Sequence, residues 1–488
     1  MKSALLFLAV LPLSAQMRTV TLPSKSPVIT LKLVLTTGSI ADPPDRPGVA
    51  NLTAALLANG GTRDKTYQQV TDALFPLASS VSHDVDNEMT SFSGSAHVET
   101  LDAYYKIFRS MLLDPGWRDD DFKRLKDAAI NALKVGLRGN NDEELGKEVL
   151  LSELYKGTPY ANYHGGTLSA LEKITLDDCK QFYKQHYTQS NLIIGLAGGY
   201  PATFLDQIKK DFASLPEKDA TPAPAIRPAA IDHTRLTIVE KNTRSVAYSF
   251  GFPLDVKRGD PDYPALLLMQ SYLGPHRMSG GRLFQRIREL RGINYGDYAY
   301  IEYFPRGGNL MEPPTNIARR SQAFQIWIRP AEPPQAAFAL RLAVFELNKL
   351  IQDGMSQADF DRTKEFLGKY VNVLTKTKRA ELGYAIDSLY YGTPAYTDYI
   401  KTALSKLTRD QVNAAIRRHL RADRLQIVAV SNNAAALKAQ LLGAGPSPIQ
   451  YNSPKPDEIL AEDKVVERYN IGLRDQDVTI VPVDQIFQ

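Results

Sequence analysis

The sequence is poor in cysteine, in excess charge of one sign and in long apolar runs, and each shortage excludes a class of protein. Cys179 is the only cysteine among the 488 residues, so neither an intramolecular disulfide nor a cysteine-based zinc site can form. The 58 basic and 54 acidic side chains leave a formal net charge of +4, which is too balanced to indicate a nucleic-acid or anionic-membrane partner. Beyond the N-terminus, no uncharged apolar stretch approaches the roughly 20 residues that span a bilayer.

The N-terminus carries the longest apolar run of the chain. Lys2 precedes the apolar residues 4–11, which are followed by Pro12 and the small pair Ser14-Ala15. This order is typical of a cleavable signal peptide, here over residues 1–16, and the alternative is a short membrane anchor. Because the run is about half as long as an anchor requires, we expect a secreted or periplasmic protein without a membrane span.

The chain is long enough for at least two domains, because single cores stop growing at roughly 250–300 residues. Three blocks recur in the same order in the second half. Residues 121–126 return at 359–364, residues 152–159 (SELYKGTP) at 387–394 (DSLYYGTP), and residues 171–175 at 404–408. This collinear repeat indicates two related halves.

Each half shows the same succession of patterns. A strand-like run opens it (residues 28–35 and 245–250), a helical periodicity follows (101–112 and 338–350), and a second strand-like run closes it (191–196 and 425–430). Strands at the ends with helices between them predict an α+β layer structure. We expect a first domain over 17–220, a Pro- and Ala-rich linker over 221–230, a second domain over 231–444 and a tail over 445–488 that wraps or docks.

Two motifs make the sequence similar to the pitrilysin/insulinase family of zinc peptidases, in particular the branch that contains mitochondrial processing peptidase. One is the repeated Leu-Tyr-x-Gly-Thr-Pro block. The other is residues 282–295, RLFQRIRELRGINY, which match the family pattern Arg-Leu-Phe-x-x-x-Arg-Glu-x-x-Gly-x-x-Tyr. The resemblance implies two homologous α/β-layer domains, each a mixed, mainly antiparallel sheet flanked by helices, which together form half of a clamshell.

Catalytic members of that family carry an inverted His-x-x-Glu-His motif shortly before a Gly-Thr pair, and here the corresponding residues 48–62 read GVANLTAALLANGGT. Aligned on Gly48, the motif positions hold Asn51, Ala54 and Ala55; aligned on Gly61-Thr62, they hold Leu52, Ala55 and Leu56. Zinc-dependent hydrolysis needs two imidazoles one helical turn apart and a carboxylate that activates water. Neither alignment supplies them, so we expect no metal site here.

The remaining candidate ligands do not restore a zinc site. By the resemblance, the third ligand falls at Asn131 or Ala132, with Glu143, Glu144 and Glu148 nearby. The densest other cluster is residues 83–88 (HDVDNE), in which His83 and Glu88 would point to opposite faces of a strand. We interpret that cluster as a polar strand or loop rather than a metal site.

The second half keeps the pair that the family uses to grip substrate, Arg288 and Tyr295. From the residues alone, Leu283, Phe284, Ile287 and Leu290 form one apolar helix face, which leaves a solvated basic face as the alternative interpretation. By the resemblance, the pair donates hydrogen bonds to substrate carbonyls and to the oxyanion that forms when zinc-bound hydroxide attacks.

The hypothesis is therefore a non-catalytic, substrate-binding subunit of a two-component zinc metallopeptidase. It would be inactive alone, and Arg288 and Tyr295 would act on the zinc site of a homologous partner in a heterodimer that hydrolyses extended, unfolded peptides. The alternatives are a non-enzymatic peptide-binding or scaffold protein derived from the peptidase fold, and an enzyme with an unrecognised site.

Overall fold

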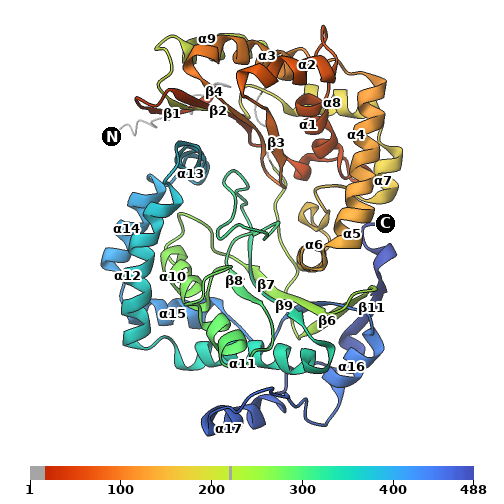
Figure 1. The fold of residues 1–488 in the computed structure, drawn as a ribbon, viewed down its shortest axis with the longest axis vertical. Helices are drawn as coiled ribbons and strands as arrows, with labels where there is room; N and C mark the ends of the chain where they lie inside the picture. The colour runs from red at the N-terminus through yellow and green to blue at the C-terminus, as the bar shows by residue number, and fades with distance from the viewer. Residues whose placement is uncertain (1–16, 219–222) are drawn as a thin grey trace, which may run out of the picture.

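The computed structural model describes residues 17–218 and 223–488, which form two similar halves, each a sheet flanked by helices (Figure 1). The expected signal peptide over 1–16 lies outside the described residues, as do residues 221 and 222 of the expected linker.

The sheet of the first half has five strands. They are β1 (Arg18–Pro23), β2 (Val28–Leu35), β3 (Ser82–Val85), β4 (Thr90–His97) and β5 (Leu192–Gly198), in the order β1-β5-β2-β4-β3. β1 runs parallel to β5, and the other neighbours are antiparallel. β3 therefore forms one edge of this sheet.

The sheet of the second half repeats this order and adds one strand. β6 (Arg235–Glu240), β7 (Val246–Leu254), β8 (Gly296–Tyr300), β9 (Gln322–Ala331), β10 (Gln426–Ser431) and β11 (Val478–Pro482) lie in the order β11-β6-β10-β7-β9-β8. β6 is parallel to β10 and to β11, and the remaining pairs are antiparallel. The predicted fold class, mixed and mainly antiparallel sheets flanked by helices, is confirmed.

The helices occupy the segments between the strands. The first half holds α1 (Val49–Asn59), α2 (Tyr67–Leu74), α3 (Leu101–Leu113), α4 (Asp119–Asn131), the π-helix η4 (Ala132–Leu137), α5 (Arg138–Asn140), α6 (Asp142–Leu154), α7 (Leu168–Lys173), α8 (Leu176–His186) and α9 (Phe204–Phe212). The second holds α10 (Tyr263–Leu273), the π-helix η6 (Phe284–Glu289), α11 (Ala336–Asp353), α12 (Gln357–Leu374), α13 (Lys378–Tyr391), α14 (Tyr396–Lys406), α15 (Arg409–His419), α16 (Ala434–Leu442) and α17 (Asp457–Val466).

Two of these helices are exchanged between the halves. α6, from the first half, packs on β7 and β10 of the second sheet, and α13, from the second half, packs on β1 and β5 of the first sheet (Figure 1). The sequence repeat SELYKGTP/DSLYYGTP falls on the ends of these two helices. The repeat therefore marks a reciprocal exchange, which interlocks the halves.

Glycines allow both exchanged helices to approach their partners closely. A Cβ on Gly146 of α6 would lie 2.9 Å from the hydroxyl oxygen of Ser249 on β7, and a Cβ on Gly195 of β5 would lie 2.7 Å from the Cδ1 atom of Ile386 on α13. A larger side chain at either position would push the helix off its neighbour.

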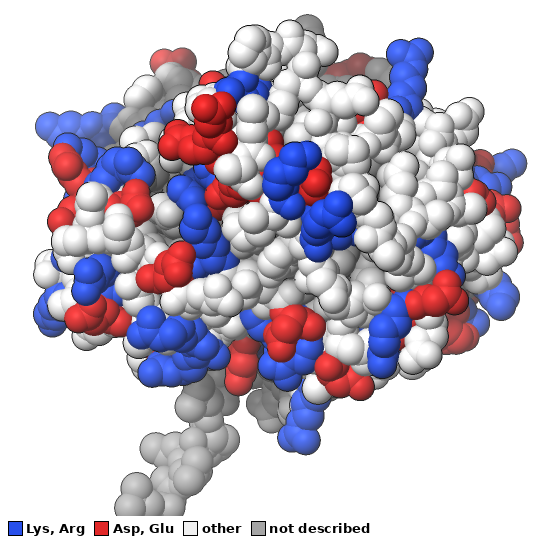
Figure 2. All heavy atoms as spheres, turned by 90° about the horizontal axis from the view of Figure 1, so that it is seen from below, with Lys and Arg blue, Asp and Glu red and all other residues white. Residues whose placement is uncertain are grey.

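The segment after Gly445 crosses the second half and ends against the first. β11 extends the second sheet beside β6, and the backbone N–H of Leu168 donates a hydrogen bond of 2.9 Å to the carbonyl of Phe487. On the face that carries α17, basic and acidic side chains are mixed rather than gathered by sign (Figure 2). Among the described residues, no helix has the length and apolar character needed to cross a bilayer.

The sequence-based interpretation placed the first strand of each half one strand too late. Each half opens with β1 or β6, ahead of the runs at 28–35 and 245–250. β1 was missed because its residues alternate between exposed and half-buried at a sheet edge, so it lacks a buried apolar run. β6 has four buried residues, Leu236–Val239, but it is short and begins at Arg235, close behind the expected linker.

Candidate functional site

Helix α1 carries the degenerate zinc-motif positions. Ala54 is fully buried, and Asn51 and Ala55 are half-buried, where α1 packs against α4, α8 and β3. In the other alignment, Leu52 and Leu56 are core residues. Asn131 ends α4 and Ala132 begins η4. The fold thus brings together the two helices that would share a metal, but their side chains at these positions are amides, methyls and leucines.

The carboxylates of α6 near this place have other partners. Lys147 lies with its ammonium nitrogen 2.8 Å from a carboxylate oxygen of Glu143. The backbone N–H of Arg306 donates to Glu144 at 2.7 Å, and the Tyr303 hydroxyl donates to Glu148 at 2.6 Å. Over 17–218 and 223–488, the structure contains no group of three or more His, Cys, Asp or Glu side chains that could hold a metal.

The cluster at residues 83–88 forms part of an ionic contact between the halves. β3 ends at Val85, and the last three residues of the cluster belong to the turn into β4. The three acids pair with arginines of the second half: Asp84 with Arg306 at 2.8 Å, Asp86 with Arg319 at 2.5 Å, and Glu88 with Arg320 at 2.8 Å. These three acidic side chains therefore form ion pairs that join the two halves.

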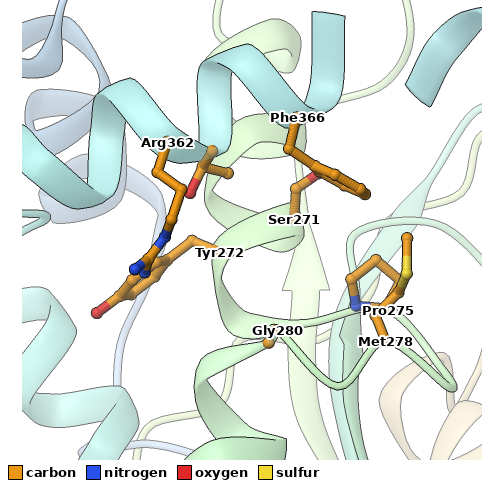
Figure 3. Close-up of a pocket in the computed structure, with 9 residues that line it drawn as sticks. Ser271, Tyr272, Pro275, Met278, Gly280, Arg362 and Phe366 are labelled. Carbon is orange, nitrogen blue, oxygen red and sulfur yellow. The ribbon is translucent and has the colours of Figure 1, made fainter. Parts of the chain in front are cut away.

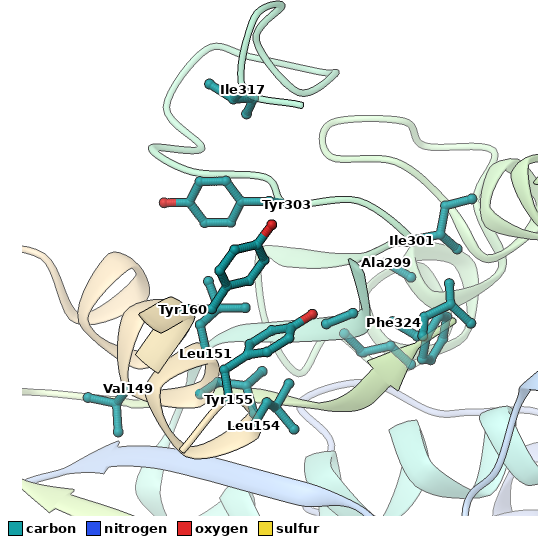
Figure 4. Close-up of a cluster of buried hydrophobic side chains, with 14 of the residues drawn as sticks. Val149, Leu151, Leu154, Tyr155, Tyr160, Ala299, Ile301, Tyr303, Ile317 and Phe324 are labelled. Carbon is teal, nitrogen blue, oxygen red and sulfur yellow. The ribbon is translucent and has the colours of Figure 1, made fainter. Parts of the chain in front are cut away.

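Those arginines belong to the segment 301–321, which connects β8 to β9 and lies between the halves. The Arg319 guanidinium carbon stands 3.5 Å from the centroid of the Tyr303 ring, in a cation–π contact that further fixes the buried charge. Below it, α6 and the turn after it contribute Val149, Leu151, Leu154, Tyr155 and Tyr160 to one apolar core with Ala299, Ile301, Tyr303, Ile317 and Phe324 (Figure 4). The two halves therefore form one interlocked body.

A cavity of about 700 Å³ remains between the first sheet and this segment. From the first half it is lined by Lys32 of β2, by Ser82, His83 and Asp84 of β3, and by Ser91 and Ser93 of β4. From the second half it is lined by parts of 306–315 and by the adjoining ends of α12 and α13. The sheet edge β3 is thus open to a cavity large enough for a short stretch of peptide.

A smaller apolar pocket of about 190 Å³ lies elsewhere in the second half. It is enclosed by the end of α10, the turn that contains Pro275 and Met278, and Phe366 of α12 (Figure 3).

The structure brings Arg288 and Tyr295 together at the surface. The Arg288 guanidinium carbon lies 4.1 Å from the centroid of the Tyr295 ring and 4.6 Å from that of Phe284. Tyr295 is 68% exposed, and neither residue of the pair lines the cavity described above. Two aromatic rings hold the guanidinium in place beside an exposed phenol, so both donors can reach a ligand outside this chain.

The helix that carries Arg288 is a π-helix, η6, a form often found at functional sites. Leu283, Phe284 and Ile287 are buried, as expected for its apolar face. On the polar side of this helix, Arg286 pairs with Glu346 at 2.6 Å and with Glu462 of α17, whereas Arg288 stays at the surface. Gly292, with φ of +68°, ends the turn.

Two buried carboxyl groups have raised pKa values, Asp297 beside the Arg288–Tyr295 pair and Glu148 on α6. Burial raises the pKa of Asp297, which accepts a hydrogen bond from Asn294 and lies close enough to feel the Arg288 charge, to about 8. Burial and the neighbouring Glu144 carboxylate raise the pKa of Glu148 to about 8. Both groups therefore keep a proton at neutral pH.

Two family models match the chain. Residues 18–167 match the model described as "Insulinase (Peptidase family M16)", and residues 173–367 match "Peptidase M16 inactive domain". Together the two matches cover most of the chain. The chain belongs to peptidase family M16. The resemblance read from the sequence is confirmed, and the chain is an M16 member without the zinc motif.

The similar M16 proteins include one described as a non-peptidase. "Non-peptidase homolog YmxG" of Helicobacter pylori is 23% identical over 81% of this chain and 87% of its own length. "Uncharacterized zinc protease YmxG" of Bacillus subtilis is 21% identical over 81% of this chain and 92% of its own.

Solved M16 structures share the fold. The peptidase M16 inactive domain from Pseudomonas fluorescens matches with a TM-score of 0.74 and 24% identity, over 85% of this chain and 95% of that one. The periplasmic protease PqqL from Escherichia coli matches with a TM-score of 0.65 and 18% identity, over 93% of this chain but 49% of that one.

Sequence reasoning missed the contact between the halves in this M16 chain. A signal for it was present in the sequence, because Asp84, Asp86 and Glu88 alternate along the chain and Arg319-Arg320 lie near the end of the long connection between β8 and β9. Complementary charges in two distant segments are consistent with an ion-pair contact, but many segments of the chain are charged, and the sequence alone does not identify which two pair.

Proposed function

We propose that this chain is the non-catalytic, substrate-binding subunit of a two-component M16 zinc metallopeptidase. In this proposal, a homologous partner carries the zinc, and Arg288 and Tyr295 reach the partner's site while extended peptides are hydrolysed. The expected signal peptide would make the heterodimer a secreted or periplasmic complex.

The observation that carries the proposal is the geometry of the pair. The zinc-motif positions hold Asn51, Ala54 and Ala55, yet Arg288 is held between two rings and Tyr295 presents its hydroxyl at the surface. A guanidinium and a phenol are suitable donors for a developing oxyanion. Because neither residue lines the cavity of its own chain, the reacting centre that they serve would belong to another chain.

The rigidity between the halves and the length of one relative support a second chain. Within 17–218 and 223–488, the ion pairs and the exchanged helices join the halves into one body, so a chamber that opens and closes would lie between two chains. The chain spans about half of PqqL, a periplasmic protease by its title. Two chains of this size would together match the length of that single one. The Helicobacter relative described as a non-peptidase supports a role without catalysis by this chain alone.

Reconstitution tests the proposal. The mature chain is purified alone, an M16 chain of the same organism with an intact His-x-x-Glu-His motif is purified alone, and the two are mixed. We expect zinc only in the second chain, and we expect hydrolysis of an unfolded fluorogenic peptide that rises when the first is added. Equal turnover by the zinc chain with and without this chain would reject the proposal.

The scaffold alternative is favoured by the network between the halves, which would stabilise an architectural shell regardless of chemistry. In that case the two chains would associate, but replacing Arg288 or Tyr295 would leave turnover unchanged.

A further inference from the structure

The cavity beside β3 has an excess of positive charge. Four of its lining residues are Lys or Arg, and two, Asp84 and Glu312, are acidic. Arg306 is paired with Asp84 at 2.8 Å, so these two charges offset each other. Glu312 holds a proton at neutral pH, because burial raises its pKa to about 8.

The other three cations have no carboxylate partner in the described parts of the chain. Lys32 is 6% exposed, and its ammonium group donates to Asn316 at 2.7 Å and to Thr315 at 3.3 Å, which are both neutral. Arg379 donates to Ser93 at 3.0 Å. Lys376 is exposed at the cavity. A buried ammonium ion whose direct hydrogen-bond partners are all neutral is costly, so the site is suited to an incoming anion.

The residues around Lys32 leave room for its side chain and shift its pKa. Gly383 on α13 makes room for it, since a Cβ there would lie 3.0 Å from the Lys32 ammonium nitrogen and 2.1 Å from the Thr315 hydroxyl oxygen. Burial lowers the pKa of Lys32 to about 8, Asp387 raises it, and the like charge of Arg379 lowers it further. Lys32 and Arg379 therefore repel each other across a space that an anion could fill.

The shape of the cavity indicates what carries that anion. Three of the four residues of β3, the edge strand, line the cavity, and an edge strand pairs through its backbone with an added extended chain. Lys32 lies two strands in from that edge, on β2, while Arg379 stands on α13 opposite the sheet.

We propose that this cavity selects extended peptides that carry a carboxylate, which binds between Lys32 and Arg379 while the peptide backbone pairs with β3. The inference rests on the proposed function in that it assigns a peptide preference to the same subunit. The carboxylate comes from an Asp or Glu side chain or from the end of the peptide chain.

Peptide binding to the isolated chain tests this inference without any partner. Labelled decapeptides with acetylated and amidated ends carry Glu, Gln or Lys at the same positions, and a further Gln peptide keeps a free C-terminal carboxylate. We expect the Glu peptide to bind roughly 10- to 100-fold more tightly than the amidated Gln peptide, as a charge-assisted hydrogen bond provides. The affinity should fall with added salt. If the free-ended Gln peptide matches the Glu peptide, the chain end is the carboxylate that binds.

Matched variants assign the effect to the cavity. Arg379→Gln and Lys32→Met should remove most of the preference for Glu and leave the affinity for the amidated Gln peptide unchanged. Lys378→Gln is the control, because it removes a charge from the same helical turn, but Lys378 pairs with Glu381 and does not line the cavity. Arg379 is exposed, so its variant remains informative if Lys32→Met fails to fold.

Equal affinities for the Glu and Gln peptides, or an equal effect of Lys378→Gln and Arg379→Gln, would overturn the inference and leave the proposed function standing. Absence of binding by every peptide would also overturn it. The proposed function would then be decided separately by turnover of the reconstituted complex.

Discussion

Replacing Arg319 by Met tests whether the ion pairs between the halves hold this chain together. Arg319 and Asp86 are 3% and 2% exposed, and the guanidinium donates two hydrogen bonds to the carboxylate, at 2.8 and 2.5 Å. Removing one partner of a buried pair leaves an uncompensated charge and costs about 3–5 kcal/mol. We therefore expect Arg319→Met to lower the free energy of unfolding by that amount.

The same contact supplies a matched control. Arg306 pairs with Asp84 across the same two halves, but its side chain is 57% exposed. Exposed pairs contribute about 0–1 kcal/mol, so Arg306→Met should cost little. The double variant Arg319→Met/Asp86→Asn should recover part of the loss, because no charge is then left buried.

Urea unfolding is a suitable assay because the chain has two tryptophans, Trp117 in the first half and Trp327 on β9 of the second. Replacing either one by Phe leaves a fluorescence signal from a single half. We expect coincident transitions that shift together in Arg319→Met. A shift confined to one half, or a cost for Arg319→Met no larger than for Arg306→Met, would refute the reasoning.

Three further predictions concern the site and its surroundings. The purified chain should hold no stoichiometric zinc and cleave no peptide, and chelator-sensitive proteolysis or a tightly bound zinc in elemental analysis would contradict this. The free energy of unfolding should fall as pH rises from about 5 to 8, by at most about 1.4 kcal/mol per pH unit for one group. The reason is that folded Asp297 keeps its proton up to a pKa of about 8, whereas an unfolded Asp loses it near about 4. Asp297→Asn should reduce that slope in urea titrations, and an unchanged slope would mean that Asp297 is ionised in the fold. Arg288→Ala should raise KM as well as lower kcat of a reconstituted complex, because guanidinium contacts to peptide carbonyls exist before the transition state. A loss in kcat alone would contradict this, because it would mean that Arg288 contacts the substrate only in the transition state.

Much of the fold could be predicted because its strands and helices have strong local patterns. Residues 28–35 and 191–196 are β-branched or aliphatic runs, and they became β2 and most of β5. The periodic residues 101–112 and 338–350 lie within α3 and α11. The polar edge strand β3 had no such pattern, since only Val85 of its four residues is fully buried.

The exchange of α6 and α13 could not be predicted from the repeat. The repeat indicates that the two segments are equivalent. The apolar pattern of each helix, however, is compatible with packing on either of the two similar sheets. Only the three-dimensional contacts, such as Gly146 against Ser249, decide the partner. For the site, the motif predicted which residues matter, and the structure adds that Arg288 and Tyr295 touch. Their role on a partner's zinc remains a prediction.

The most direct test of the central claim is the rate of the reconstituted complex with Tyr295→Phe. This change removes one hydroxyl and keeps the ring that lies 4.1 Å from the Arg288 guanidinium carbon, so the chain should fold and assemble as before. If the hydroxyl stabilises the oxyanion on the partner's zinc, kcat should fall by about 10²–10³ with little change in complex formation. An unchanged kcat, or a loss of assembly in place of a loss of rate, would contradict the account.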